Sequence, residues 1–321
     1  MNITVLALEG AFDTGLVTVL DAFTTANELA QALGMQTVGF HISVVAVSPQ
    51  VHTALGLKVP VMAVEEAPPA DWVIVPALGY KMPDSLVPAL ARPDIAAAVA
   101  ALQGWAAGGA RIAAACIGTF VLAESGLLDG CEATTSWWLT PLFRQRYPQV
   151  RLDPHRIIVP SGRVLTAGAG FSHIDLALWV IRQGNPELAA LVARYLIVDS
   201  RPSQTAYVIS DHLAHTDPLI ERFDHWVRDH LSQPLNLDEA ASALATSKRT
   251  LSRRLHEVLG KTPIAYIQDL RVERAAHLLK TSDSSVERIA EMVGYADGVT
   301  LRTLLRKRLG KGVRELRGQG G

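Results

Sequence analysis

The last hundred residues contain one helical unit that occurs twice, and this duplication is the strongest constraint on how the chain folds. At an offset of 50 residues the same letters return, so that Leu251, Leu255, Leu259, Gly260 and Lys261 correspond to Leu301, Leu305, Leu309, Gly310 and Lys311. Leucines spaced by four residues form one buried helical face, and a following glycine ends the helix. The C-terminal part is therefore predicted to be an all-α domain built from an internal repeat.

Each copy has the pattern of two helices joined by a short break. In the first copy, residues 237–244 form an amphipathic helix, and the helix after it is capped by Thr246 or Ser247. In the second copy the corresponding helix is expected from about Asp297 to Leu309. This is the helix-turn-helix pattern, in which the second helix enters the major groove of DNA. The two motifs are predicted at about 236–259 and 286–309.

The outward positions of both second helices carry basic and hydroxyl side chains, which suit the phosphates and base edges of double-stranded DNA. The predicted DNA contacts are Ser247, Lys248, Arg249, Thr250, Ser252, Arg253, Arg254, Asp297, Gly298, Thr300, Arg302, Arg306 and Lys307. The alternative is a solvated basic face on an ordinary helical bundle, but its occurrence in two copies in register favours DNA.

The charge distribution agrees with a DNA-binding rear. Residues 1–220 hold 12 Lys and Arg against 18 Asp and Glu, a net charge of −6. Residues 221–321 hold 18 against 13, a net charge of +5. Only the C-terminal part is therefore expected to approach a polyanion.

The segment "GKTPIAYIQDLRVERAAHLLKTSDSSVERIAEMVGYAD" resembles the AraC/XylS type of transcriptional regulator, and the resemblance extends over residues 219–317. It implies two recognition helices that enter successive turns of the major groove, about 34 Å apart, on a specific operator. We expect an activator, which would also contact RNA polymerase. Thr303 stands where this family usually has an arginine. The second helix is therefore expected to read fewer bases than the first.

Residues 1 to about 198 alternate buried strands with helices. The apolar segments 3–8, 40–48, 71–78 and 110–116 are separated by helical segments near 16–33, 94–107 and 118–126. This alternation predicts an α/β fold, a flavodoxin-like parallel sheet with helices on both faces. Ligands of such sheets bind beyond the carboxyl ends of the strands, and Cys116 lies at one of these ends.

Cys116 stands between the strand and the helix of "ARIAAACIGTFVLAESGLLDG" with no loop on either side. The helix N-terminus would favour its thiolate and lower the pKa of the thiol. A working nucleophile also needs a base, and the adjacent Ile117 cannot accept a proton. The other interpretation is a small residue that fits a tight turn.

This segment resembles the ThiJ/PfpI superfamily, which is related to class I glutamine amidotransferases and places a cysteine at this turn. Catalytic members usually have a histidine after the cysteine and a glutamate near the end of the first strand. Glu9 matches the glutamate, whereas Ile117 and the Ser136 of "TTSW" stand where related chains have histidines. The resemblance therefore implies a non-catalytic domain that dimerises and senses a small molecule, often an amino acid or a quaternary amine in relatives of this architecture. The candidate ligand-binding residues are Glu9, Asp13, Cys116, Ile117, Ser136 and Trp138.

Two alternatives remain open. The first is a cysteine-dependent hydrolase or hydratase, in which a histidine from elsewhere, such as His173, serves Cys116. The second is a redox-responsive regulator in which oxidation of Cys116 is the signal. The spacing of His212, His215, His225 and His230 could suit a metal, but no cysteine or carboxylate cluster completes the site. Neither a metal nor a cofactor is therefore expected.

The expected organisation is a sensing and dimerisation domain over 1–206, a linker over 207–218 and a DNA-binding domain over 219–317. The opening "MNITVLALEG" has no basic leader, and the uncharged run 95–110 is rich in alanine and glycine. No export and no membrane span are expected. Two cysteines cannot form a disulfide framework, which favours a reducing cytoplasm. The sequence thus predicts a cytoplasmic, homodimeric transcriptional regulator.

Overall fold

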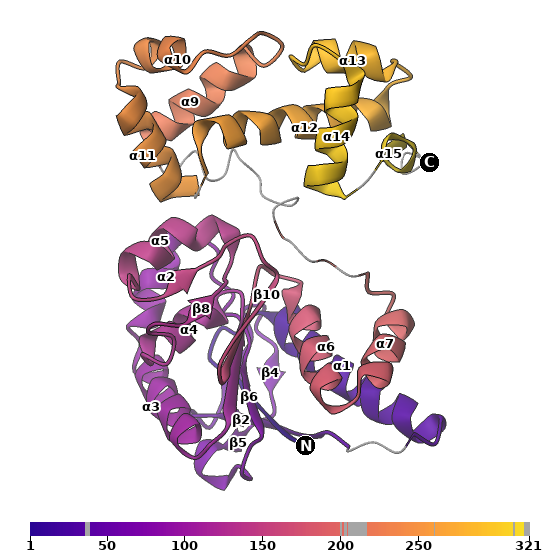
Figure 1. The fold of residues 1–321 in the computed structure, drawn as a ribbon. Helices are drawn as coiled ribbons and strands as arrows, with labels where there is room; N and C mark the ends of the chain where they lie inside the picture. The colour runs from indigo at the N-terminus through magenta and orange to yellow at the C-terminus, as the bar shows by residue number, and fades with distance from the viewer. Residues whose placement is uncertain are drawn as a thin grey trace. The chain divides into compact units, whose positions relative to one another are not determined.

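The computed structural model describes residues 1–35, 39–199, 201, 204, 217–259, 261–310 and 312–317. The chain divides into two compact units, Met1–Thr205 and Ala206–Gly321 (Figure 1). Residues 207–216 of the expected linker, with His212 and His215, lie outside the described residues. The expected linker end at 217–218 already belongs to the first helix of the second unit, where Asp217 is the N-cap.

The N-terminal unit contains a seven-stranded sheet in the order β10-β11-β7-β6-β1-β2-β5. Its strands are β1 (Asn2–Leu6), β2 (His41–Ala46), β5 (Met62–Ala63), β6 (Trp72–Val75), β7 (Arg111–Ala115), β10 (Ile158–Ser161) and β11 (Val164–Ala167). β10 runs antiparallel to β11, and the other neighbouring pairs are parallel. The central order β2-β1-β6-β7-β11 is the flavodoxin-like arrangement, so the predicted fold class is confirmed.

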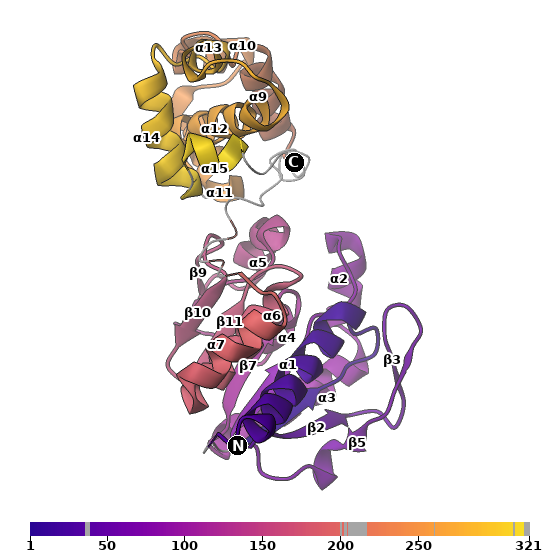
Figure 2. The ribbon, with the colours of Figure 1, turned by 90° about the vertical axis from the view of Figure 1, so that its right-hand side faces the viewer.

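Helices cover both faces of this sheet (Figure 2). One face carries α1 (Asp13–Ala32), α6 (Ser172–Gly184) and α7 (Pro186–Tyr195). The other carries α2 (Pro83–Leu90), α3 (Pro93–Ala107), α4 (Gly118–Glu124) and α5 (Thr140–Arg146). The strands are apolar on both sides because alternate residues face opposite cores: in β7, Ala113 and Ala115 join the first core, whereas Ile112 and Ala114 join the second.

Short elements complete the unit. β3 (Val51–His52) and β4 (Lys58–Val59) form an antiparallel pair, and β8 (Glu132–Ala133) pairs in parallel with β9 (Arg151–Leu152). Two 3₁₀ turns are η1 (Val64–Glu66) and η2 (Trp137–Leu139).

No single helix among the described residues is long and apolar enough to cross a membrane. Taken together, α2 and α3 have the length and the apolar composition of a membrane-spanning helix, but the two helices are bent by 66° at their junction. Both helices bury side chains, including Leu86 and Ile95, in the core of the N-terminal unit.

The C-terminal unit is helical throughout its described elements. These are α9 (Pro218–Asp229), α10 (Leu237–Ala243), α11 (Lys248–Leu259), α12 (Pro263–Thr281), α13 (Val286–Met292), α14 (Gly298–Leu309) and α15 (Val313–Arg317). The pairs α10–α11 and α13–α14 are the two copies of the repeat, and α12 lies between them in sequence (Figure 1).

The leucine pattern of the repeat forms the core of both copies. Leu251, Leu255 and Leu259 are buried in α11, as are Leu301 and Leu305 in α14, while Leu309 is half-buried. The Oγ of Ser247 accepts a hydrogen bond from the Thr250 N–H, so Ser247 caps α11. Asp297 caps α14 in the same way, and Gly310 ends that helix with a φ of +69°. The predicted limits of the second recognition helix, about Asp297 to Leu309, therefore agree with those of α14.

The helix α4 begins in close contact with the sheet. A Cβ added at Gly118 would lie 2.4 Å from the Val75 carbonyl oxygen and 2.6 Å from that of Pro76. Gly104, inside α3, would meet nothing within 4 Å. Close backbone contact therefore requires glycine at position 118, whereas position 104 has room for a larger side chain.

The variant Gly118→Ala should lower the free energy of unfolding by about 1–3 kcal/mol, because the backbone of β6 and α4 must separate to admit the methyl group. The matched control Gly104→Ala should raise it by about 0.5–1 kcal/mol, since alanine restricts the unfolded chain and favours the helix. Urea unfolding of the full chain measures both. Equal effects at the two positions would contradict the close contact at Gly118.

Candidate functional site

Cys116 occupies a sharp turn at the carboxyl end of β7. Its φ of +56° lies in the left-handed region, which residues other than glycine rarely adopt. The Cys116 N–H donates to the Ala167 carbonyl at 2.9 Å, and the Thr135 hydroxyl donates to the Cys116 carbonyl at 2.7 Å. Hydrogen bonds from both neighbouring segments therefore hold the unfavourable conformation in place.

The Cys116 thiol is buried and has one side-chain hydrogen-bond partner. Its Sγ lies 2.9 Å from the Ser136 Oγ, and its residue is only 4% exposed. Burial raises the pKa of the thiol above its ordinary value, although Ser136 and the backbone N–H groups of Gly170 and Ile117 act in the opposite direction. The expectation of a lowered pKa is wrong, because desolvation outweighs the stabilisation offered by the start of a short helix.

His173 lies in the same region but is not available as a base. Its Nε2 accepts a hydrogen bond from the Ala77 N–H at 3.1 Å, so its Nδ1 carries the proton and donates to the Gly170 carbonyl. The ring is fully buried, and a Cβ on Gly15 would lie 2.6 Å from its Nε2. Burial lowers the pKa of His173 to about 4. His173 is therefore neutral at physiological pH, and both of its nitrogens are used within the fold.

Two acidic candidates are oriented toward the loop around β3. The Glu9 carboxylate accepts from the His52 N–H at 2.9 Å and lies 3.6 Å from the His52 Nδ1, with about half of each side chain exposed. The Asp13 Oδ2 accepts from the Leu55 N–H at 3.2 Å. The Asp13 Oδ1 is buried and has no hydrogen-bond partner in the described part of the chain. A buried oxygen left in this state is unusual in folded proteins and points to a missing partner.

Phe12 and Trp138 pack against the core cluster that contains Cys116, and Lys81 contacts both of them. The Trp138 Nε1 donates to the Lys81 carbonyl at 3.0 Å, and the Lys81 Nζ lies 5.7 Å from the centre of the Phe12 ring. The Lys81 charge acts on Cys116 and helps to oppose the rise in its pKa, while the Phe12 ring lies 6.1 Å from that of His173. Sequence reasoning missed Phe12 and Lys81. Their positions in the segments that follow β1 and β6 were the available signal.

The two adjacent tryptophans differ in burial. Trp137 is 8% exposed and belongs to the core, and its ring meets that of Trp138 edge-on at 5.3 Å between centres. Trp138 is half-buried. Among the six predicted ligand contacts, the structure thus brings Cys116, Ile117 and Ser136 together at the turn.

Gln204 ties the turn to the end of the N-terminal unit. Its side chain is buried, and its Nε2 donates to the carbonyls of Thr135 at 3.0 Å and Pro154 at 2.8 Å. Its Oε1 accepts from the Ala169 N–H at 3.0 Å. Thr135 and Ala169 are the residues next to Ser136 and Gly170, which both contact the thiol. Sequence reasoning placed this residue only near the end of the domain at 206 and did not assign it this role.

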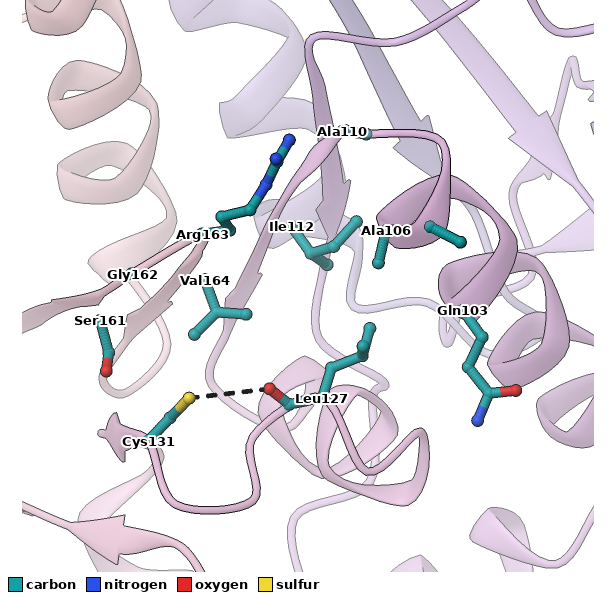
Figure 3. Close-up of a pocket in the computed structure, with 11 residues that line it drawn as sticks. Gln103, Ala106, Ala110, Ile112, Leu127, Cys131, Ser161, Gly162, Arg163 and Val164 are labelled. Carbon is teal, nitrogen blue, oxygen red and sulfur yellow. Dashed lines mark hydrogen bonds between the residues drawn. The ribbon is translucent and has the colours of Figure 1, made fainter.

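A cavity of about 560 Å³ lies at the opposite end of β7 from Cys116 (Figure 3). It is lined by Gln103, Ala106, Ala107, Ala110, Ile112, Leu127, Cys131, Ser161, Gly162, Arg163 and Val164. The lining is mainly aliphatic, and the Cys131 Sγ contacts the Leu127 carbonyl at 3.8 Å. The cavity contains none of the predicted ligand residues.

The two predicted recognition helices, α11 and α14, are called the reading helices below. Some of their exposed cations are paired with carboxylates of the same unit and others are not. Several are paired within the unit: Lys248 with Asp238 at 2.6 Å, Arg253 with Glu257 at 2.8 Å, and Arg302 with Glu287 at 2.8 Å. Arg254 forms ion pairs with Glu257 and with the buried Asp217, which caps α9. Arg249, Arg306 and Lys307 are exposed and form no ion pair with any described residue. These three are the cations that are free to meet a phosphate or a base.

Within the described ranges, no group of three or more His, Cys, Asp or Glu side chains is arranged to hold a metal ion. His230 stacks on Trp226 with 4.5 Å between ring centres, and its Nδ1 donates to the Trp226 carbonyl. Both cysteines are free thiols.

The chain matches two family models. Residues 1–183 match the DJ-1/PfpI family, and residues 240–319 match a helix-turn-helix domain. Among solved structures, an AraC family transcriptional regulator from Pseudomonas putida is 21% identical with a TM-score of 0.50, and the match covers 61% of this chain and 98% of that one. A ThiJ/PfpI family protein from Pseudomonas syringae is 20% identical with a TM-score of 0.51, covering 63% and 76%. These structures support the fold of the N-terminal unit.

Curated relatives from Pseudomonas aeruginosa are transcriptional regulators of the helix-turn-helix type. GbdR is 28% identical over 198 residues, which are 60% of this chain and 54% of that protein. ArgR is 29% identical over 223 residues, 68% of each chain. The match thus spans about half the length of GbdR and two thirds that of ArgR. The chain therefore belongs to the DJ-1/PfpI family, its C-terminal unit contains a helix-turn-helix domain, and it is similar to HTH-type transcriptional regulators.

Proposed function

We propose that the N-terminal unit binds a small effector at the Cys116 turn without transforming it, and that the C-terminal unit binds a double-stranded operator through α11 and α14. The regulator would act in the cytoplasm as a homodimer formed by the N-terminal unit, and would activate transcription together with RNA polymerase. The observation that carries the sensing role is the Cys116 turn, where the thiol contacts the Ser136 hydroxyl and, within the described part of the chain, no base.

Three features support a non-catalytic turn. The partner of the thiol is Ser136, whose hydroxyl is a poor base at neutral pH. Ile117 follows the cysteine, and the neighbouring His173 is neutral with both nitrogens engaged. The thiol itself is protonated because burial raises its pKa. Among the described residues, no side chain at this turn is therefore placed to remove and return a proton, as a hydrolase or hydratase needs.

The surrounding side chains favour an effector with a cation and a carboxylate. The unpartnered Asp13 Oδ1 would accept a hydrogen bond from an ammonium group. The exposed Lys81 would pair with a carboxylate, and the Phe12 and Trp138 rings offer faces to an alkylated or aliphatic amine. An amino acid or a betaine carries both charges on one small molecule, which is consistent with the ligand class expected from the sequence.

Gln204 offers a route by which the effector would alter the DNA-binding unit. It is bonded to residues next to both Ser136 and Gly170, and it lies one residue before the end of the N-terminal unit. An effector that moves either segment would change the anchoring of the chain that leads to the second unit. Effector binding would then favour one arrangement of the dimer over another.

Cys116 should react slowly with iodoacetamide at pH 7, by about tenfold or more relative to free cysteine, because only the thiolate reacts and burial raises the thiol pKa. The rate should rise with pH and should still be rising above the ordinary thiol pKa of about 8.5, because it levels off only above the raised pKa of Cys116. The measurement uses Cys131→Ser, with Cys116→Ser as the matched control. Rapid labelling or peroxide oxidation of Cys116 at pH 7 would instead support the redox-responsive alternative, and turnover lost in Cys116→Ser would support the enzyme.

A thermal-shift screen of the full chain against amino acids and betaines should identify an effector that raises the melting temperature. Asp13→Asn should weaken its binding at least about tenfold, since an ionic hydrogen bond contributes about 1.5–3 kcal/mol. Lys81→Met should weaken carboxylate-bearing effectors but not the corresponding uncharged amides. Isothermal titration measures both effects.

A matched variant tests the location of the effector. Ala107→Phe fills the cavity at the opposite end of β7 (Figure 3) and should leave effector affinity unchanged. Loss of binding in Ala107→Phe, with normal binding in Asp13→Asn, would assign the effector to that cavity and overturn its placement at Cys116.

Arg249→Ala should weaken operator binding by about 1–3 kcal/mol without changing stability, because Arg249 has no ion-pair partner among the described residues. Arg254→Ala should lower the melting temperature, since it leaves the buried Asp217 without its cation. Gel-shift titration and thermal unfolding separate the two effects. Unchanged operator binding by Arg249→Ala would show that Arg249 of α11 contacts neither a base nor a phosphate.

A further inference from the structure

The two reading helices present different chemistry at equivalent positions. With the offset of 50 residues, Arg249 and Arg253 of α11 correspond to Val299 and Thr303 of α14. All four residues are exposed, and Val299 is 68% exposed. The first copy thus offers two guanidinium groups where the second offers a valine and a threonine.

The polar side chains around Val299 are already engaged inside the unit. The Asp297 carboxylate caps α14 by accepting from the Thr300 N–H at 2.7 Å, and it also accepts from the Thr300 hydroxyl at 3.1 Å. Arg302 is paired with Glu287 of α13 at 2.8 Å. The first turns of α14 therefore lack a free hydrogen-bond donor of the kind that Arg249 provides in α11.

Thr303 lies one helical turn after Val299 and shares its face. Its hydroxyl donates to the Val299 carbonyl at 3.0 Å, so this proton is not available to a base. In the first two turns of this face, what remains exposed is methyl groups from Val299 and Thr303, spaced by four residues, and the free Arg306 follows one turn later. A β-branched valine in the first turn does not favour the helix, and its exposed side chain is not part of the buried core.

In the major groove, one feature of a base pair is apolar, and that is the 5-methyl group of thymine. We propose that α14 reads thymine by contact of Val299, supported by Thr303, with this methyl group, whereas α11 reads through the Arg249 guanidinium. This inference rests on the proposed function of α14 as a reading helix. It makes the second half-site of the operator one in which thymine is chosen by apolar contact.

The test begins with operators selected from random duplexes by the full-length protein, and with footprinting to locate the half-site bound by α14. Each thymine of that half-site is then replaced by deoxyuridine, which lacks only the methyl group. One replacement should weaken binding about three- to fivefold, as expected for one methyl group removed from an apolar contact.

Val299→Ala should weaken binding to the thymine operator by a similar factor and should cause no further loss on the deoxyuridine operator. Val299→Arg, which restores the residue type of Arg249, should shift the selected base at this position from thymine toward guanine. The control Ile264→Ala removes another exposed aliphatic side chain, outside the reading helices, and should leave all affinities unchanged.

The inference is overturned if every deoxyuridine replacement is neutral, or if Val299→Ala loses the same factor on both operators. Failure of the proposed function would look different. In that case Arg249→Ala would also leave operator affinity unchanged, and no half-site could be assigned to α14. A variant that fails to fold is recognised by its melting temperature, and the deoxyuridine series with the native protein then decides.

Discussion

The left-handed turn at Cys116 is the constraint around which the N-terminal unit is arranged. β7 lies between β6 and β11 in the sheet, and the chain must leave its end and enter α4 at once. The positive φ of Cys116 makes this reversal possible, and the hydrogen bonds that Cys116 donates to Ala167 and accepts from Thr135 stabilise it. Gly118 then lets α4 approach the carbonyl groups of β6. Strain at one residue is thus compensated by the packing of the segments around it.

The contacts of the Cys116 thiol at this turn differ from those that a catalytic nucleophile needs. The geometry that exposes a nucleophile in an enzyme is retained, but the thiol is buried against Ser136 and its pKa is raised. The histidine that remains nearby serves the backbone of Ala77 and Gly170. Charged groups occur elsewhere in this unit: the buried Asp13 Oδ1, which has no hydrogen-bond partner among the described residues, and the exposed Lys81 beside Phe12. Such an arrangement is suited to holding a charged small molecule.

In the C-terminal unit, duplication preserved the core and changed the surface. The first two leucines of α11 and of α14 are buried at equivalent positions because each copy needs the same packing face. The outward residues carry no such requirement, and here arginine is replaced by valine and threonine. Pairing within the unit narrows the set of free cations further, since Lys248, Arg253, Arg254 and Arg302 all have acidic partners.

The sequence by itself determined the two-part architecture, the parallel sheet, the helical repeat and the cysteine at the end of β7. These follow from local patterns: periodic burial, repeated leucines, and a strand followed directly by a helix. The contacts of the six predicted ligand residues could not be predicted from such local patterns. Which carboxylate oxygen lacks a partner, which cation is paired, and whether a thiol is buried depend on residues far apart in the chain. Lys81 acting on Cys116 and Gln204 bonded to Thr135 are such cases, because only folding brings these groups together and only then does desolvation set their chemistry.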